Sequence, residues 1–297
     1  RGLPPLPHGC SVASVCRLLG ADGLNYLLAA FLTECKILLH SDEIGNLCMV
    51  SEVLTALLYP FQWTLPYVPV LPVEMMEIIE APCSFLLGVP SCSMDFVHPS
   101  LLEDIVVVDL DRDFASSDFF EARRTGVKTK APVPLPAASA SNISKAVYRL
   151  LRAENEVEES IGSASFPGAR SFPRTEPESL AEREFRISVA LEVCCLIRGF
   201  DDCLVFSSSQ PVFSVDKFLQ IAPSIFEEQR SSGVSSQGHG PLPQGRVVSE
   251  RSRRFISILV CCQHFHQFLE ALDSDSLAFF HAIMRSVKAK ATAKSSL

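Results

Sequence analysis

The stretch from Thr33 to Pro72 constrains the fold most strongly, because two short apolar runs surround a segment with helical periodicity. The first run, Lys36 to His40, is continuously apolar at its centre, as expected for a strand covered on both faces. Apolar residues then recur at helical spacing from about Asn46 to Leu58, and Pro60 ends that helix. The second run, Tyr67 to Leu71, has the length of a strand. Strands that alternate with helices in this way indicate a mostly parallel sheet.

Further segments continue the same alternation on both sides of this stretch. Phe85 to Val89 and Ile105 to Leu110 are apolar runs with the length of buried strands. Helical spacing is found from Val12 to Leu19 and from Leu24 to Leu32, and Val73 to Ile79 has one apolar face. We therefore predict an α/β fold in which a mostly parallel sheet is flanked by helices, followed by a helical downstream part.

Composition divides the chain into parts with different character. We predict a central α/β segment over residues 1–120, a flexible low-complexity insertion over 121–177, a helical segment over 178–285 with a flexible loop at 231–245, and a basic tail over 286–297. Within the insertion we expect poor order, although Ser144 to Glu154 has a helical pattern.

The downstream segment carries clear helix signals. Ser179 is the expected N-cap of a long amphipathic helix that runs to Arg198 and is closed by Gly199. Further helices are predicted over Val215 to Ile221, from about Glu250 to Leu272 and over Ser276 to Lys288.

The overall composition is that of a folded globular chain, since 47% of the 297 residues are hydrophobic and 20% are charged. The uninterrupted apolar runs are shorter than the roughly 18 residues that cross a bilayer. A net charge of −8 disfavours nucleic acid as a partner. Eleven cysteines, including adjacent pairs such as Cys194 and Cys195, indicate a reducing compartment and hence a cytoplasmic protein. The start at Arg1, followed by a proline-rich stretch, reads as an excision from a longer protein rather than a signal peptide.

Motifs for nucleotide phosphates and for covalent catalysis are absent from the sequence. Neither a P-loop nor a Gly-x-Gly-x-x-Gly turn occurs, and the Gly-x-Ser-x-Gly pattern of hydrolases is missing. The glycines between Gly233 and Gly245 follow no strand and are typical of a linker. We therefore predict no cofactor and no catalytic residue.

The best candidate for a metal site is a cysteine and histidine cluster near the C-terminus. Cys262 and His266 are four residues apart and would share a helix face, with Cys261 and His264 beside them. The surrounding apolar residues favour a packed helix instead, and no second ligand group occurs elsewhere.

A second candidate consists of the carboxylates that follow the last strand of the α/β segment. Asp109, Asp111 and Asp113 alternate in sequence and offer oxygen ligands for Mg²⁺. A solvated turn explains the same pattern more simply, because no phosphate loop accompanies it. No metal site is predicted.

Trp63, the only tryptophan, lies in a turn beside Phe61 and Gln62. An exposed tryptophan there would anchor a partner, whereas a packed one would pin the turn on the sheet. The sequence leaves both interpretations open.

Five blocks in this order resemble the central segment of the DENN domain family. They are Leu32 to Leu39, Ala56 to Trp63, Tyr67 to Pro72, Ala81 to Val89 and Asp104 to Asp111. A weaker resemblance to the family's downstream helical part covers Ile187 to Leu272.

The resemblance implies a module that binds a GDP-bound Rab-family small GTPase and promotes GDP release in membrane traffic. Such exchange needs no covalent catalyst, because the factor lowers the nucleotide affinity of the GTPase by binding one of its states more tightly. The family's upstream longin-like lobe is expected to lie outside this chain. Two alternatives stay open: a scaffold or adaptor without exchange activity, and a metal-dependent hydrolase that uses Asp109 and Asp111.

Partner-facing residues are predicted from the geometry of parallel sheets, in which ligands bind where strands end. On this basis Gln62, Trp63, Asp111 and Arg112 are expected to contact the partner. The basic clusters Arg123 to Lys130 and Arg246 to Arg254 predict peripheral association with acidic lipid, with solvated loops as the simpler alternative. Recruitment of a cytoplasmic protein to vesicle or endosomal membranes would follow.

Overall fold

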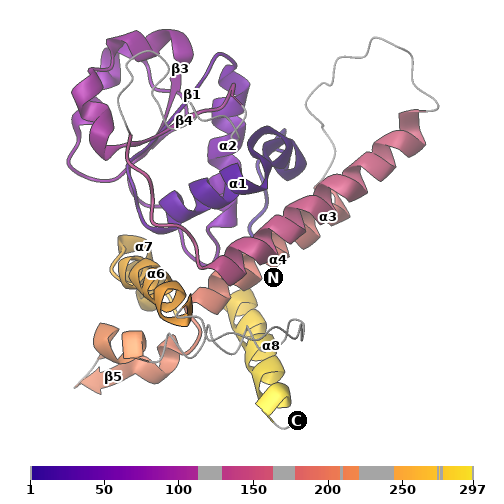
Figure 1. Ribbon diagram of the computed structural model, residues 1–297, viewed down its shortest axis with the longest axis vertical. Coiled ribbons are helices and arrows are strands. Elements are labelled where there is room, and N and C mark those ends of the chain that lie inside the picture. The colour runs from indigo at the N-terminus through magenta and orange to yellow at the C-terminus, as the bar shows by residue number, and fades with distance from the viewer. Residues whose placement is uncertain are drawn as a thin grey trace.

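The computed structural model describes residues 2–112, 129–162, 178–207, 210–220, 244–272, 274 and 277–295. An α/β unit comes first, and long helices and a small hairpin follow it (Figure 1). The helices are α1 (Val12–Leu32), α2 (Ile44–Leu57), α3 (Ala137–Gly162), α4 (Leu180–Leu196), α6 (Gln244–Leu259), α7 (Gln263–Glu270) and α8 (Ala278–Ser295). The strands are β1 (Ile37–Ser41), β2 (Tyr67–Val68), β3 (Leu86–Pro90), β4 (Val106–Asp109), β5 (Leu204–Ser207) and β6 (Gln210–Phe213).

The α/β unit is built on a four-stranded parallel sheet with the order β2-β3-β1-β4. The central strand β1 pairs with β3 and β4, so that Ile37 lies opposite both Leu86 and Val106. All five residues of β1 are buried, because neighbouring strands cover both edges and packed layers cover both faces. The predicted fold class is confirmed.

Alternate residues of the strands face two different layers. Leu39, Leu86 and Val108 pack with α1 and α2 in the main core. Leu38, Leu87 and Val107 form a smaller core on the opposite face. That second layer consists of three short 3-10 helices, η1 (Val73–Glu80), η2 (Ser91–Phe96) and η3 (Pro99–Asp104).

Helix α1 consists of the two predicted helices joined at a kink. Gly20 has φ 64° and ψ −178°, which interrupts the helical backbone at a residue that tolerates positive φ. By length and composition, α1 is the one helix of the described ranges that could cross a membrane, with a mean hydropathy of 1.3 in its apolar window. However, 67% of that window is buried inside the protein, as in the core helix of a globular domain.

Two predicted elements are shorter or tighter than expected. The strand predicted over Tyr67 to Leu71 is regular only over Tyr67–Val68, because Pro69 lacks an N–H group for the ladder. Pairing resumes locally where the Leu71 N–H donates to the carbonyl of Gly88 over 2.7 Å. The helix predicted over Val73 to Ile79 is a 3-10 helix. Gly88 has no side chain because a Cβ there would lie 1.9 Å from the carbonyl oxygen of Pro69.

Poor order was expected over 121–177 apart from a helical pattern at Ser144 to Glu154, and the described part from 129 to 162 is more ordered than that. Helix α3 occupies 26 residues of it and runs along α4 (Figure 1). Ile143, Val147 and Leu150 are buried in the main core, and this apolar row offsets the cost of ordering the helix. The parts at 113–128 and 163–177 lie outside the described residues.

The downstream part is mainly helical, with two differences from the prediction. Ser179 caps α4 through a reciprocal capping box with Glu182, and Gly199 follows the helix with φ 83°. The hairpin of β5 and β6 was not predicted. The helix predicted from Glu250 to Leu272 is divided at Val260 to Cys262 into α6 and α7. Residues 215–220 are helical as predicted, and most of the predicted loop at 231–245 lies outside the described residues.

Candidate functional site

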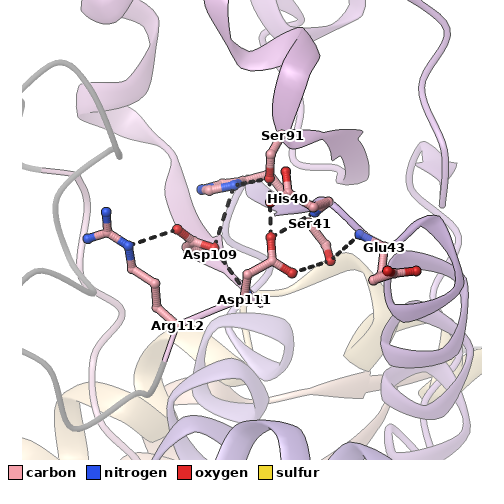
Figure 2. A network of polar contacts seen from close by, with 8 residues as sticks. His40, Ser41, Glu43, Ser91, Asp109, Asp111 and Arg112 are labelled. Atoms are coloured by element: carbon pink, nitrogen blue, oxygen red, sulfur yellow. Dashed lines mark hydrogen bonds and ion pairs between the residues drawn. The ribbon is translucent and has the colours of Figure 1, made fainter.

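Polar side chains from three strands meet at the carboxyl edge of the parallel sheet (Figure 2). His40 and Ser41 end β1, Ser91 follows β3, and Asp109 ends β4. Parallel pairing sets His40 beside Asp109, so the strand ends come together at one edge.

Asp111 joins the end of β4 to the turn between β1 and α2. Its Oδ1 accepts a hydrogen bond of 2.6 Å from the Ser41 hydroxyl, and its Oδ2 accepts one of 2.7 Å from the Asp42 N–H. The Ser91 hydroxyl donates to Oδ2 over 3.4 Å. Ser41 in turn accepts a hydrogen bond of 3.0 Å from the Glu43 N–H. One carboxylate therefore fixes the start of α2 relative to two strand ends.

Asp109 forms the buried centre of the edge and is only 3% exposed. The Arg112 Nε lies 3.2 Å from its Oδ2, and the Asp111 N–H donates to its Oδ1 over 3.1 Å. His40 Nδ1 lies 3.9 Å from Oδ1 and 3.2 Å from the Ser91 hydroxyl. A buried carboxylate is tolerated when a cation and hydrogen bonds compensate its charge, as they do here.

Arg112 and Asp111 both reach solvent from this network: Asp111 is exposed, and 32% of the Arg112 side chain is exposed. Asp109 holds the guanidinium through Nε, so the orientation of the planar group is restricted before any partner arrives. We call His40, Ser41, Ser91, Asp109, Asp111 and Arg112 the edge network.

The edge network does not have the form of a magnesium site. Both oxygens of Asp111 accept hydrogen bonds, and the guanidinium of Arg112 lies where a cation would bind Asp109. Asp113 lies outside the described residues. The hydrolase interpretation therefore gains no support from Asp109 and Asp111.

The four predicted contact residues form two separate pairs. Asp111 and Arg112 lie at the carboxyl edge, as expected. Gln62 and Trp63 precede β2 and lie toward the amino ends of the strands, where Trp63 stacks on Phe31 with ring centroids 4.3 Å apart. Gln62 is exposed, whereas Trp63 is partly buried, so the tryptophan pins its turn on α1. Whether either pair contacts a partner stays a prediction.

The sequence analysis missed His40, Ser41 and Ser91. The available signal was the polar residue at the end of each apolar run, since the ends of parallel strands meet at one edge.

A second polar cluster joins the α/β unit to the downstream helices. Glu34, Cys262 and His264 offer ligand-type atoms that all lie within 4.8 Å of one another. The Glu34 carboxylate accepts hydrogen bonds from the backbone N–H of Gln263 at 2.9 Å and of His264 at 2.8 Å. It therefore caps the N-terminus of α7 from a position more than 200 residues away in sequence.

The side chain of His264 completes this cap. His264 is 1% exposed, its Nδ1 lies 2.8 Å from Glu34 Oε1, and its ring packs on Phe61 at 4.8 Å. Burial raises the pKa of Glu34, but the side-chain and backbone hydrogen bonds from His264 and Gln263 outweigh it and lower the pKa below 4.5. Burial raises the pKa of the Cys262 thiol, so the protonated form is favoured.

The cap explains two features of the chain. Cys261 and His266, predicted as possible companions of Cys262 and His264, are not part of the cluster, because the helix restarts at Gln263. Glu34 follows α1 with φ 46°, and Cys35 and Glu34 close the helix with backbone hydrogen bonds to Ala30 and Phe31. Glycine is usual at this left-handed position. A carboxylate stands there because it caps α7.

Comparison with known proteins shows what the α/β unit is similar to. The family model of the DENN (AEX-3) domain matches residues 2–113, which include the whole four-stranded sheet and the edge network up to Arg112. The resemblance inferred from the sequence is confirmed over this segment.

The curated relatives carry the same domain in their names. DENN domain-containing protein 2C of Mus musculus is 34% identical over 97 residues, which are 33% of this chain and 11% of that protein. The Homo sapiens protein of that name is 33% identical over 100 residues, or 34% of this chain and 10% of the relative. DENN domain-containing protein 2A of Mus musculus is 36% identical over 87 residues, which are 29% of this chain and 9% of that protein. The match thus covers about a tenth of each relative's length.

Proposed function

We propose that this chain is the GTPase-binding part of a guanine-nucleotide exchange factor for a Rab-type small GTPase. The observation that carries the proposal is the DENN-domain match over residues 2–113, because these same residues build the sheet and its carboxyl edge. The family is associated with Rab GTPases in general terms. Binding of the GDP-bound form and promotion of GDP release are the specific proposals.

The edge network supports a recognition role rather than acid–base chemistry. Arg112 presents a partly exposed guanidinium whose direction is restricted by Asp109, and such a group recognises a carboxylate or phosphate with defined geometry. Exchange then arises from differential affinity: a surface that binds the nucleotide-free GTPase more tightly than the GDP-bound form shifts the population toward release.

The proposed setting is the cytoplasmic face of vesicle or endosomal membranes. Exposed Arg251, Arg253 and Arg254 on α6 supply positive charge for acidic lipid. The segment from Arg123 to Lys128 lies outside the described residues.

The test is release of a fluorescent GDP analogue from a panel of Rab GTPases, with the chain alone and with a longer protein that adds an upstream longin-like lobe. Acceleration on one or two GTPases supports exchange activity. Tight binding of a nucleotide-free GTPase without acceleration would favour the adaptor function instead. The proposal is refuted if neither protein binds a Rab GTPase and neither accelerates GDP release.

Two variants locate the contact within this assay. Arg112→Ala removes the guanidinium and is expected to weaken GTPase binding about tenfold or more, as expected for loss of a charged contact at an interface. Arg112→Lys keeps the charge but not the planar fork, so an intermediate loss is expected. The unfolding midpoint of each variant separates lost binding from lost folding, because Arg112 also compensates buried Asp109.

A further inference from the structure

The sheet segment has an unusual distribution of charge. Residues 37–111 contain eleven Asp and Glu residues and no Lys or Arg. The bordering basic residues are Lys36 and Arg112, which are engaged with Asp104 and Asp109 respectively. A long one-sign segment in a folded protein creates a negative potential over the surface that it builds.

Much of this charge lies on the thin layer of 3-10 helices. The layer covers the Leu38, Leu87 and Val107 face of the sheet, so its outer side faces away from the long helices. Its exposed acidic residues are Glu74, Glu77, Glu80, Asp95, Glu103 and Asp104. Among them, Asp104 pairs with Lys36 at 3.7 Å and with Lys130 at 2.9 Å.

Large apolar side chains are exposed among these carboxylates. Val73 is 43% exposed, Met75 is 46% exposed and Phe96 is 66% exposed. They belong to η1 and η2, which contact each other. A single exposed apolar residue needs no explanation, but three on two adjoining short helices are typical of an interaction surface. We define Val73, Glu74, Met75, Glu77, Asp95 and Phe96 as the η face.

The charge of the η face selects among occupants. An anionic bilayer or a nucleic acid would be repelled by the carboxylates, and a second copy would bring the same negative charge. A protein segment with an apolar row bordered by Lys or Arg complements both features. We propose that the η face docks a basic amphipathic segment of a partner protein. It lies on a sheet face rather than at the carboxyl edge, so this partner is additional to the GTPase proposed above.

A defined probe tests the proposal. The probe is a fluorescein-labelled amphipathic peptide with leucines on one helix face and lysines on the other, titrated with the full chain by fluorescence anisotropy. Saturable binding that weakens with added salt is expected. A peptide with glutamates in place of lysines should not bind. Equal binding of the two peptides would overturn the proposal.

Matched variants locate the binding. Met75→Ser with Phe96→Ser is expected to weaken binding about tenfold, which corresponds to the loss of about 1.4 kcal/mol of apolar contact. Glu74→Gln with Glu77→Gln should weaken it severalfold and reduce its salt dependence. The control pair is Leu180→Ser with Glu184→Gln on α4, where Leu180 is 73% exposed. Unchanged affinity of the η-face variants, or an equal loss in the control pair, refutes the assignment.

Two further measurements separate this inference from neighbouring ones. Vesicles containing phosphatidylserine should neither bind the η face nor compete with the peptide. If vesicles compete with the peptide for the parent protein but not for the η-face variants, the choice of a protein partner is overturned. Met75→Ser with Phe96→Ser should leave GDP release unchanged. A parallel loss of GDP release would assign the η face to the GTPase itself and remove the additional partner.

Discussion

Glu34 allows the structure to be tested sharply, because its backbone and its side chain have opposite effects on stability. The left-handed backbone costs about 1 kcal/mol for any residue with a Cβ. The carboxylate accepts two backbone N–H groups of α7 and contacts the His264 side chain. Hydrogen bonds to a charged group contribute about 1.5 kcal/mol each, so the cap is expected to contribute about 3 kcal/mol.

Three substitutions separate these contributions. Glu34→Ala loses the cap and keeps the backbone cost, so a loss of about 3 kcal/mol is expected. Glu34→Gly loses the cap but relieves the backbone, so it should be about 1 kcal/mol more stable than Glu34→Ala. Glu34→Gln keeps one acceptor oxygen and turns an amide N–H₂ toward a backbone donor, so an intermediate loss is expected.

The assay is equilibrium urea unfolding, followed by Trp63 fluorescence and by helical circular dichroism. Trp63 reports the α/β unit through its stacking on Phe31, and the dichroism reports the long helices. A Glu34→Gly variant as stable as the parent would refute the cap. Equal stabilities of Glu34→Gly and Glu34→Ala would refute the left-handed strain.

Three other predictions concern the pH dependence of the Glu34 cap, Gly88 and the cysteines. Because the pKa of Glu34 is lowered on folding, its contribution to stability is complete above the unfolded pKa of about 4.5 and is lost as the pH falls through the lower folded pKa. The stability difference between the parent and Glu34→Gln, measured by urea midpoints, should therefore shrink as the pH is lowered below that range. Gly88→Ala should destabilise by about 3 kcal/mol or more, because its Cβ would overlap the carbonyl of Pro69, whereas Gly45→Ala, with no atom within 4 Å of the added Cβ, is the matched control. Alkylation followed by mass spectrometry should modify four exposed thiols in the native protein and the five buried thiols only in urea. Burial raises the pKa of a thiol, that of Cys16 to about 12, and so keeps it protonated and unreactive. Labelling of the buried thiols in the native protein would contradict the packing. The exposed thiols are Cys48, Cys83, Cys92 and Cys261, and the buried ones are Cys16, Cys35, Cys194, Cys203 and Cys262.

The sheet was predictable from sequence because its signals are local. Continuous apolar runs such as Phe85 to Val89 reflect burial on both faces, which few other elements require. The carboxyl edge was partly predictable for the same reason, and Asp111 and Arg112 were found there. Ser91 was missed because its role depends on which strand ends are neighbours in the sheet.

The elements that were predicted too short or missed depend on distant contacts. Helix α3 is polar overall, and its apolar row is stabilised by packing on α1 and α4 rather than by its own propensity. The break between α6 and α7 depends on a carboxylate from residue 34. The residues around Gln263 contain no pattern that indicates this contact with Glu34.

The same long-range packing implies that the family match does not mark a physical domain boundary. Helix α1 lies within residues 2–113 and packs against α3, and one continuous core runs from Val12 to Met284. Asn25 adds hydrogen bonds to the Ala140 carbonyl at 3.2 Å and to the Ser144 hydroxyl at 2.9 Å. Cutting the chain after Arg112 would expose the buried face of α1.

The expected result of that cut follows from the size of the exposed surface. Fully exposing each large apolar side chain costs about 1.5–3 kcal/mol, so even three of them approach the whole net stability of a domain. A fragment of residues 1–112 should therefore aggregate or unfold without cooperativity, as judged by gel filtration and urea unfolding. Coexpression with residues 113–297 should restore a soluble complex, because the missing core is then supplied in trans. A monomeric 1–112 fragment with a cooperative transition would show that the sheet is stable without the downstream helices, and the continuous core would then contribute specificity rather than stability.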